Sequence, residues 1–149
     1  MKKMGIGVAG CGSTGIQSVC QHTVFPDECE LVYTAAVMDP VPGRAKYIAE
    51  RFNVPKYYED YDEMLADPNV ELVTLASPIG VHFEQGMKAI RAGKHVHFNK
   101  TMCLTAEEAT KMIEEAEKYG VKLVSSPGQM TSPALRRMRK AILTGEIGI

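Results

Sequence analysis

Apolar residues follow two different spacings along this chain. Short runs that are almost continuously apolar and rich in β-branched residues predict buried strands. Apolar residues that recur every three or four positions, as at Ala45, Ile48, Ala49 and Phe52, predict amphipathic helices between those strands. The predicted strands are Met4–Ala9, Leu31–Met38, Lys56–Tyr58, Val70–Leu75, His95–Asn99 and Lys122–Ser125.

Capping signals delimit several of the predicted helices. Asp60 with Glu63 predicts a short helix that ends at Asp67-Pro68, and Thr105 with Glu108 forms a capping box. The remaining helices are predicted from apolar stripes at Ile16, Val19, Cys20 and Val24, at Phe83, Met87 and Ile90, and, after the cap Ser132-Pro133, at Leu135, Met138 and Ile142.

Strands that alternate with helices predict a parallel sheet with helices on both faces, because right-handed crossovers place them there. The expected fold class is therefore α/β, a doubly wound parallel sheet of the Rossmann type, in a single three-layer domain that spans residues 1–149. Such sheets bind ligands beyond the carboxyl ends of their strands, near the point where the strand order reverses. The loops after the strands are thus the candidate sites.

A glycine-rich loop joins the first strand to the first helix. Its residues are Gly10, Cys11, Gly12, Ser13, Thr14 and Gly15, which match the pattern GxGxxG. In this setting, unpaired amides and the positive end of the helix dipole attract a dinucleotide diphosphate. The first glycine is expected to permit the tight turn, the second to admit the phosphates, and the third to let the helix approach the sheet. The alternative is a plain strand-to-helix turn.

Asp39 ends the second strand, near the spacing of about 20 residues at which an acid binds the adenine ribose. Its carboxylate would accept hydrogen bonds from ribose hydroxyls and repel a 2′-phosphate, so we expect NAD as the cofactor. Arg44 could offset that charge, and NADP is therefore not excluded. The alternative for Asp39 is a turn residue before Pro40.

The composition limits the classes of partner that we expect. A net charge of −1 gives no basic field for nucleic acid or anionic membranes, so neither is expected as a partner. The four cysteines form no CxxC pair and no signal peptide precedes the first strand, which favours free thiols and a cytoplasmic location. His95 and His97 share one strand face but lack a third ligand at suitable spacing, so no metal site is expected.

The chain resembles the glucose-fructose oxidoreductase and inositol dehydrogenase family, written Gfo/Idh/MocA. The segments that carry the resemblance are the glycine loop, Met38-Asp39-Pro40, Ala76-Ser77-Pro78 with His82, the run from Gly93 to His97, Asn99-Lys100-Thr101, and Gly145-Glu146-Ile147-Gly148. The resemblance implies a nicotinamide-dependent oxidoreductase that acts on a hydroxyl or carbonyl carbon of a sugar, cyclitol or similar polyol.

The resemblance also implies site residues. Lys100 takes the place of the family's catalytic lysine, which can hydrogen-bond the reacting oxygen and stabilise its alkoxide character. Ser77, Pro78 and Asn99 are implied as cofactor-binding residues, as is Lys100 itself. His82 is implied either as a cofactor-loop residue or as a helix cap. The alternative for Lys100 is a solvated loop lysine.

Three features depart from the family pattern. Asn99 and Thr101 replace the usual glutamate and proline around the lysine, Ile79 stands where asparagine is common, and Ser126-Pro127-Gly128-Gln129 replaces a loop that often carries asparagine and arginine. The dinucleotide side therefore fits the family pattern better than the substrate side.

Family members also carry a second, substrate-binding domain, which we expect to be absent from this chain. The isolated chain is accordingly expected to bind dinucleotide weakly and to turn over nothing, and homo-oligomers are possible through the second domain. A non-catalytic dinucleotide-sensing or structural Rossmann module is the alternative function, and a methyltransferase is a third hypothesis.

Overall fold

The computed structural model describes residues 2–23, 30–126 and 132–147. The strands in this part of the chain are β1 (Met4–Ala9), β2 (Val32–Met38), β3 (Lys56–Tyr58), β4 (Leu72–Leu75), β5 (His95–Asn99) and β6 (Leu123–Ser126). The α-helices in the same part are α1 (Ser13–Thr23), α2 (Arg44–Phe52), α3 (Tyr61–Ala66), α4 (His82–Arg91), α5 (Ala106–Tyr119) and α6 (Pro133–Leu143), and a 3₁₀ turn, Ile79–Val81, precedes α4.

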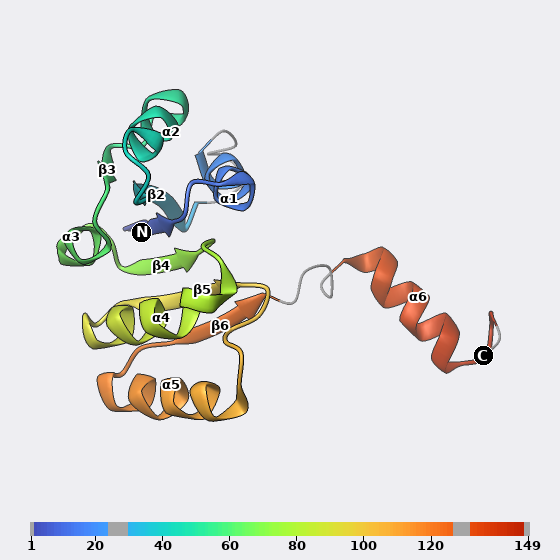
Figure 1. Cartoon of the computed structure of the whole chain (residues 1–149). Helices are drawn as coiled ribbons and strands as arrows, with labels where there is room; N and C mark the ends of the chain where they lie inside the picture. Colours follow the sequence, from blue (N-terminus) through green and yellow to red (C-terminus); the bar gives the residue numbers. More distant parts are fainter. Residues whose placement is uncertain (1, 24–29, 127–131, 148–149) are drawn as a thin grey trace.

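All the strand pairs are parallel, and the sheet has the order β3-β2-β1-β4-β5-β6 (Figure 1). The predicted doubly wound Rossmann fold is confirmed. From β1 the chain winds outwards through β2 to β3 and then crosses back to β4, so the winding direction reverses between β1 and β4. The carboxyl ends of those two strands form the switch point at which this fold class binds ligands.

Helices cover both faces of the sheet and bury one apolar cluster on each. On one face, α1 and α2 pack over Val8 and Val37, with Ile48 of α2 almost fully buried. On the other face, α3, α4 and α5 pack over Val96 and Phe98. Burying a side chain of this size contributes about 1.5–3 kcal/mol, so the two clusters account for much of the stability of the fold.

The capping signals are largely confirmed. Asp60 accepts a hydrogen bond from the Glu63 amide, and Thr105 forms a complete capping box with Glu108. Ser132 occupies the cap of α6, but its side chain makes no capping hydrogen bond, and Pro133 sits in the first turn. The predicted helical residue Val24 lies outside the described residues, as do positions 127–129 and Gly148.

Strand β4 is shorter than the sequence predicts, since it begins at Leu72 and not at Val70. The Val70 amide donates to the Asp67 carbonyl in a turn, so this residue is buried without pairing in the sheet. Short apolar runs do not distinguish a paired strand from a buried turn.

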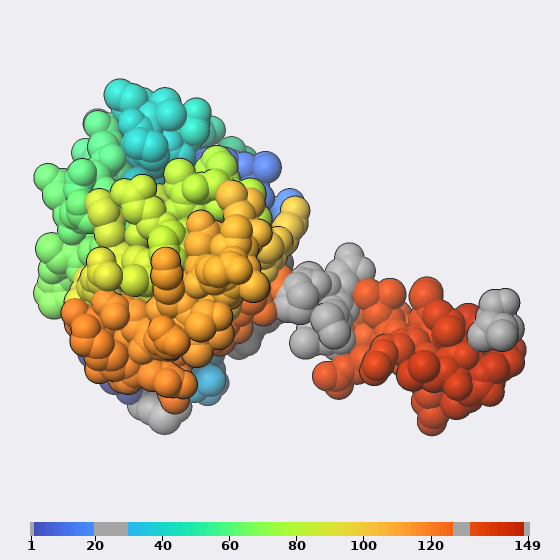
Figure 2. Space-filling model, turned by 60° about the horizontal axis from the view of Figure 1, so that its bottom comes forward, coloured from blue at the N-terminus to red at the C-terminus, as the bar shows by residue number. Residues whose placement is uncertain are grey.

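Helix α6 lies apart from the sheet and its covering helices (Figures 1 and 2). Its apolar side chains Met138, Ile142 and Leu143 are exposed. Among the described residues, no helix combines the length and the apolar composition that a membrane crossing requires.

A buried carboxylate anchors the turn between α3 and β4, at the end of the sheet opposite the switch point. Asp67 accepts hydrogen bonds from Lys56 Nζ at 3.0 Å, from Tyr58 Oη at 3.1 Å and from the backbone and side-chain amides of Asn69 at 2.9 and 3.0 Å. Burial by itself raises the pKa of this carboxyl, but the hydrogen bonds outweigh burial and lower the pKa to about 2.

We predict that Asp67→Asn destabilises the fold by about 2 kcal/mol at neutral pH, because it weakens hydrogen bonds to a buried charge. The folded-state pKa lies below the ordinary 3.8, so the charge stabilises the fold above that value. The stabilisation is lost as the pH falls towards about 2. Urea unfolding of both proteins across this range measures the difference.

The matched control is Asp62→Asn on α3, which removes an exposed carboxylate that pairs with Lys88 on the surface. Exposed ion pairs contribute about 0–1 kcal/mol, so this variant should unfold close to the wild type. Equal destabilisation by the two substitutions would contradict the special role of Asp67.

Candidate functional site

The glycine loop brings the first turn of α1 against the end of β1. A side chain at Gly15 is impossible without rearrangement, because a Cβ atom there would lie 1.8 Å from the Gly10 carbonyl oxygen. Gly10 itself has a φ of 98°, which L side chains rarely adopt. A Cβ atom at Gly12, in contrast, would meet nothing within 4 Å. The loop is therefore tight beneath the helix and open where Gly12 faces the cleft.

The open side of this loop is suited to an anion. Helix α1 begins at Ser13, and the first amides of a helix have no carbonyl partner within it. These amides and the helix dipole together attract a phosphate or diphosphate. A cleft of about 640 Å³ begins here and extends between the ends of β1, β2 and β4. Its lining includes Gly10, Gly12, Ser13, Thr14, Met38, Asp39, Pro40, Val41, Arg44, Ser77, Pro78 and Gln85.

Asp39 connects the end of β2 to the glycine loop. Its side chain is buried, and Oδ2 accepts a hydrogen bond from the Cys11 amide at 2.8 Å while Oδ1 accepts one from the Val41 amide at 3.0 Å. Arg44 Nη1 lies 3.3 and 3.4 Å from the two carboxylate oxygens. The carboxylate therefore fixes the loop, and the half-exposed guanidinium of Arg44 balances its charge at the wall of the cleft.

Cys11 is buried beneath the loop and does not line the cleft. Its thiol lies 3.6 Å from the Met38 carbonyl oxygen. Burial, with a smaller contribution from the nearby Asp39 charge, raises the pKa of the Cys11 thiol to about 12. The thiol is therefore protonated and unreactive near neutral pH, and the contribution of this residue to the loop is its backbone amide.

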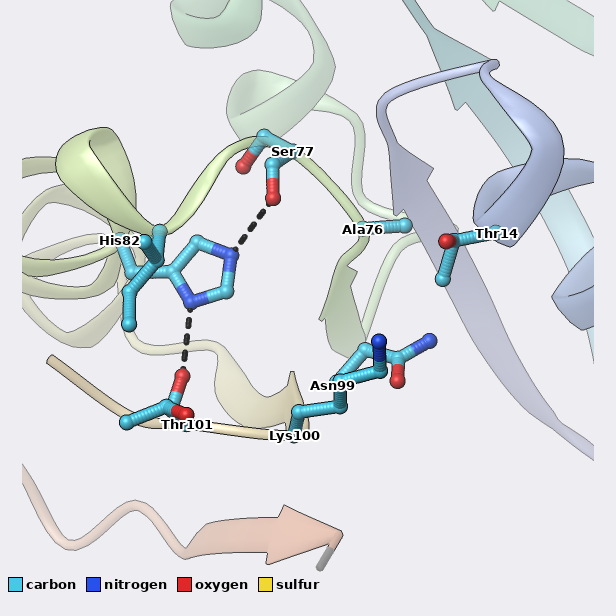
Figure 3. A pocket seen from close by; sticks show the side chains of 8 residues that line it. Thr14, Ala76, Ser77, His82, Asn99, Lys100 and Thr101 are labelled. Atoms are coloured by element: carbon cyan, nitrogen blue, oxygen red, sulfur yellow. Dashed lines mark hydrogen bonds between the residues drawn. The ribbon is translucent and has the colours of Figure 1, made fainter. Parts of the chain in front are cut away.

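A second cavity has a volume of about 290 Å³. It is lined by Thr14, Ala76, Ser77, Ile79, His82, Asn99, Lys100 and Thr101 (Figure 3). Thr14, Ala76 and Ser77 belong to the walls of both cavities, so the cleft and the second cavity are neighbours. The loops after β4 and β5 thus continue the site from the glycine loop towards Lys100.

Lys100 has a strained backbone. Its φ of 71° lies in the left-handed region, which a residue with a side chain adopts at an energetic cost of about 1–3 kcal/mol. Neighbouring strand β6 holds it there, because the Lys100 amide donates to the Ser126 carbonyl at 3.1 Å and the Ser125 hydroxyl donates to the Lys100 carbonyl. Strain of this kind concentrates at functional sites.

The structure brings together most of the residues that the sequence singled out. Gly10, Gly12, Ser13, Thr14, Asp39, Ser77 and Pro78 line the larger cleft, and Ser77, His82, Asn99 and Lys100 line the smaller cavity. Cys11 and Gly15 lie behind these surfaces and support the loop. The roles assigned to all these residues in cofactor binding, and to Lys100 in catalysis, remain predictions.

Sequence reasoning missed Gln85. The Gln85 side-chain oxygen accepts a hydrogen bond of 2.5 Å from the Ser77 hydroxyl, and Gln85 lines the larger cleft. The available signal was its position on α4, since a residue three places after His82 lies on the same helix face. Ser125 and Ser126 were also missed as supports of Lys100, because the pairing of β6 with β5 is a long-range feature.

His95 and His97 project from the same side of β5, as predicted from the alternation of side chains along a strand. His95 Nδ1 accepts a hydrogen bond from the Lys122 amide at 3.0 Å, and His97 lines a polar hollow between α1 and β6. Asn99, on that same side, lines both this hollow and the Lys100 cavity.

Comparison with known proteins agrees with this geometry. Residues 4–126 match the Gfo/Idh/MocA family, described as an oxidoreductase family with an NAD-binding Rossmann fold. The chain is 29% identical over 148 residues to myo-inositol 2-dehydrogenase of Thermotoga maritima, a match that covers 97% of this chain and 42% of that protein. It is 31% identical over 112 residues to scyllo-inositol 2-dehydrogenase (NAD(+)) of Bacillus subtilis, which covers 75% of this chain and 33% of that protein.

Among solved structures, an NAD-binding oxidoreductase from Klebsiella pneumoniae aligns with a TM-score of 0.81 at 28% identity. That alignment covers 99% of this chain and 40% of the other, so the chain spans about a third to two fifths of the length of such relatives. The matched family, the strand order and the placement of the glycine loop agree, and this chain belongs to the Gfo/Idh/MocA oxidoreductase family as its NAD-binding Rossmann domain.

Proposed function

We propose that this domain holds NAD(H) for the reversible oxidation of a hydroxyl-bearing carbon in a sugar, cyclitol or similar polyol. The observation that carries the proposal is the continuity of the site: a cleft with an anion-binding loop adjoins a cavity that contains a lysine in a strained, fixed backbone conformation. The named relatives that act on inositols support the substrate class.

The residues of the cleft fit a dinucleotide. Gly12 leaves open space beside the first amides of α1, which is where a diphosphate would be bound. Asp39 stands at the end of β2, where an acid can accept hydrogen bonds from the adenine ribose. The nicotinamide group would supply the hydride acceptor, and the neighbouring cavity around Lys100 is the place for the reacting part of the substrate.

Lys100 would act on the substrate oxygen. In the oxidation, its amine would take the proton of the substrate hydroxyl as a hydride passes from the adjacent carbon to the nicotinamide. In the reduction, it would stabilise the negative charge that forms on the carbonyl oxygen and return the proton. The bonds to β6 hold the lysine backbone before substrate arrives, so little reorganisation is needed during the reaction.

Two experiments test the proposal. Calorimetric titration of residues 1–149 with NADH and with S-adenosylmethionine determines the ligand class, and we expect heat only with NADH. Formation of NADH from NAD and myo-inositol is then measured on the whole reading frame that contains these residues. NADH binding without turnover of any polyol would instead support a dinucleotide-sensing module, which the unusual flanks Asn99 and Thr101 favour as the second candidate.

We predict opposite effects for two glycines of the loop. Gly12→Ala should leave thermal unfolding unchanged and weaken NADH binding by at least about tenfold, because the new methyl group occupies open space where the diphosphate binds. Gly15→Ala should destabilise the fold by roughly 1–3 kcal/mol or more, because its Cβ atom collides with a backbone oxygen.

Circular dichroism melting and NADH titration of the two variants separate these effects. If a folded Gly12→Ala protein bound NADH as tightly as the wild type, the diphosphate would not lie beside Gly12. A stable Gly15→Ala protein would show that α1 can move away from β1.

We predict that the wild-type protein prefers NADH to NADPH, because the Asp39 charge repels a 2′-phosphate. Asp39→Asn, which keeps a hydrogen-bond acceptor but loses the charge, should reduce the preference by about tenfold, or about 1.4 kcal/mol. Arg44→Gln should increase the preference, since it removes the cation that balances Asp39. Dissociation constants for both cofactors measure the ratio, and a shift in the same direction for both variants would contradict this account.

We predict that Lys100→Met lowers the turnover of a polyol by about 10²–10⁴-fold, which is typical for loss of an acid–base group. The affinity for NADH should stay within about threefold, because the proposed diphosphate and ribose contacts lie in the other cavity and distant sites contribute almost independently. Lys94→Met is the matched control, since Lys94 lies at the opposite end of the sheet, where its Nζ donates to the backbone carbonyls of Asp67 and Val70. Unchanged turnover in Lys100→Met would favour the sensing function.

A further inference from the structure

The imidazole of His82 contacts two loops at once (Figure 3). His82 is the first residue of α4, and its side chain is almost fully buried. Nε2 lies 2.9 Å from the carbonyl oxygen of Ser77, in the loop after β4. Nδ1 lies 2.9 Å from the carbonyl oxygen of Thr101, in the loop after β5. The ring therefore spans the wall of the Lys100 cavity.

Both partners of the ring are acceptors, which constrains its protonation. A backbone carbonyl oxygen cannot donate, and 2.9 Å is a typical length for an N–H···O hydrogen bond. A neutral imidazole has one N–H group and one lone pair, so it would set a lone pair against one of the two carbonyl oxygens. Only the doubly protonated ring donates to both.

We propose that His82 is an imidazolium ion that acts as a positioning residue, joining the Ser77 loop to the Lys100 loop. The effect of His82 on catalysis rests on the proposed function of Lys100. The protonation state of His82 and its two hydrogen bonds do not depend on that function. Loss of either ring proton releases one of the loops, so the geometry around Lys100 changes with pH.

The charges around the ring act in both directions. The amino end of α4 and the cation of Lys100, which lines the same cavity, oppose a positive charge on His82. The negative ends of two carbonyl dipoles favour it through charge-assisted hydrogen bonds. Glu84 on α4 is exposed, and burial raises the pKa of the Cys103 thiol in the loop that follows Thr101, so this thiol adds no charge. No carboxylate in the described residues forms an ion pair with His82.

The contact with Thr101 completes the support of the strained lysine. On the β6 side, Ser125 and Ser126 bond the carbonyl and the amide of Lys100. On the α4 side, His82 bonds the carbonyl of the next residue. The Lys100 loop is thus held by residues of both β6 and α4. Of these contacts, the hydrogen bond from His82 to the Thr101 carbonyl requires a proton on Nδ1 of the ring.

A second histidine of the same protein provides an internal reference. His95 Nδ1 accepts a hydrogen bond from the Lys122 amide, so that nitrogen carries a lone pair and no proton. The same spectrum can therefore contain one histidine with two protonated nitrogens and one with an unprotonated Nδ1.

The deciding measurement is ¹⁵N nuclear magnetic resonance of the histidine rings in residues 1–149 without ligand. We expect both ring nitrogens of His82 in the protonated range at neutral pH, with His95 Nδ1 in the unprotonated range. An unprotonated nitrogen on His82 at neutral pH would overturn the proposal. The measurement uses the wild-type protein without cofactor, so it is independent of any failure to bind NADH.

The positioning role is tested through Lys100 itself. In the wild type, the amide resonance of Lys100 should shift with pH in step with the titration of His82. In His82→Gln, whose side-chain amide does not titrate, this step should disappear, and the Lys100 amide should exchange about tenfold faster because the two ring hydrogen bonds are lost. His95→Gln is the control and should retain the step. A Lys100 resonance that ignores the His82 titration in the wild type would overturn the positioning role, even if His82→Gln failed to fold.

Discussion

The close approach of the first turn of α1 to the end of β1 is the constraint on which the site depends. No side chain fits between Gly15 and the Gly10 carbonyl, so the first amides of α1 lie directly beside the carboxyl end of β1. The buried Asp39 carboxylate holds the loop from β2 through the Cys11 amide. These contacts fix the amides before any ligand arrives, which supports the proposal that they bind the diphosphate of a dinucleotide.

The two halves of the site are built differently. The larger cleft is built around the glycine loop, and it contains one buried carboxylate, Asp39, whose charge Arg44 balances. The Lys100 cavity consists of side chains from loops after β4 and β5, held by hydrogen bonds to β6 and α4. Side chains on loops can vary without disturbing the sheet. This arrangement supports the proposal that the cleft binds NAD(H) and that the loops around Lys100 contact the substrate.

Buried polar groups fix loops in both halves of the site and at the opposite end of the sheet. Asp39 fixes the glycine loop, Asp67 fixes the turn before β4, and His82 spans two loops. Each has its partners within the described chain, which removes the cost of burying a polar group. Of these three groups, Asp67 has a pKa lowered to about 2, so its contribution to stability is lost only in strong acid.

The sequence by itself determined the alternation of strands and helices, the capped helix starts and the glycine loop, because these depend on local spacing and on backbone conformations that few residues adopt. It also placed Asp39, Ser77, His82 and Lys100 after strands whose ends meet. Only the tertiary structure decided that Val70 lies in a turn, that Gln85 joins Ser77, and that β6 holds Lys100 in a left-handed conformation. Those features arise from contacts between residues distant in the chain or across a helix turn, and local pattern carries no record of such contacts.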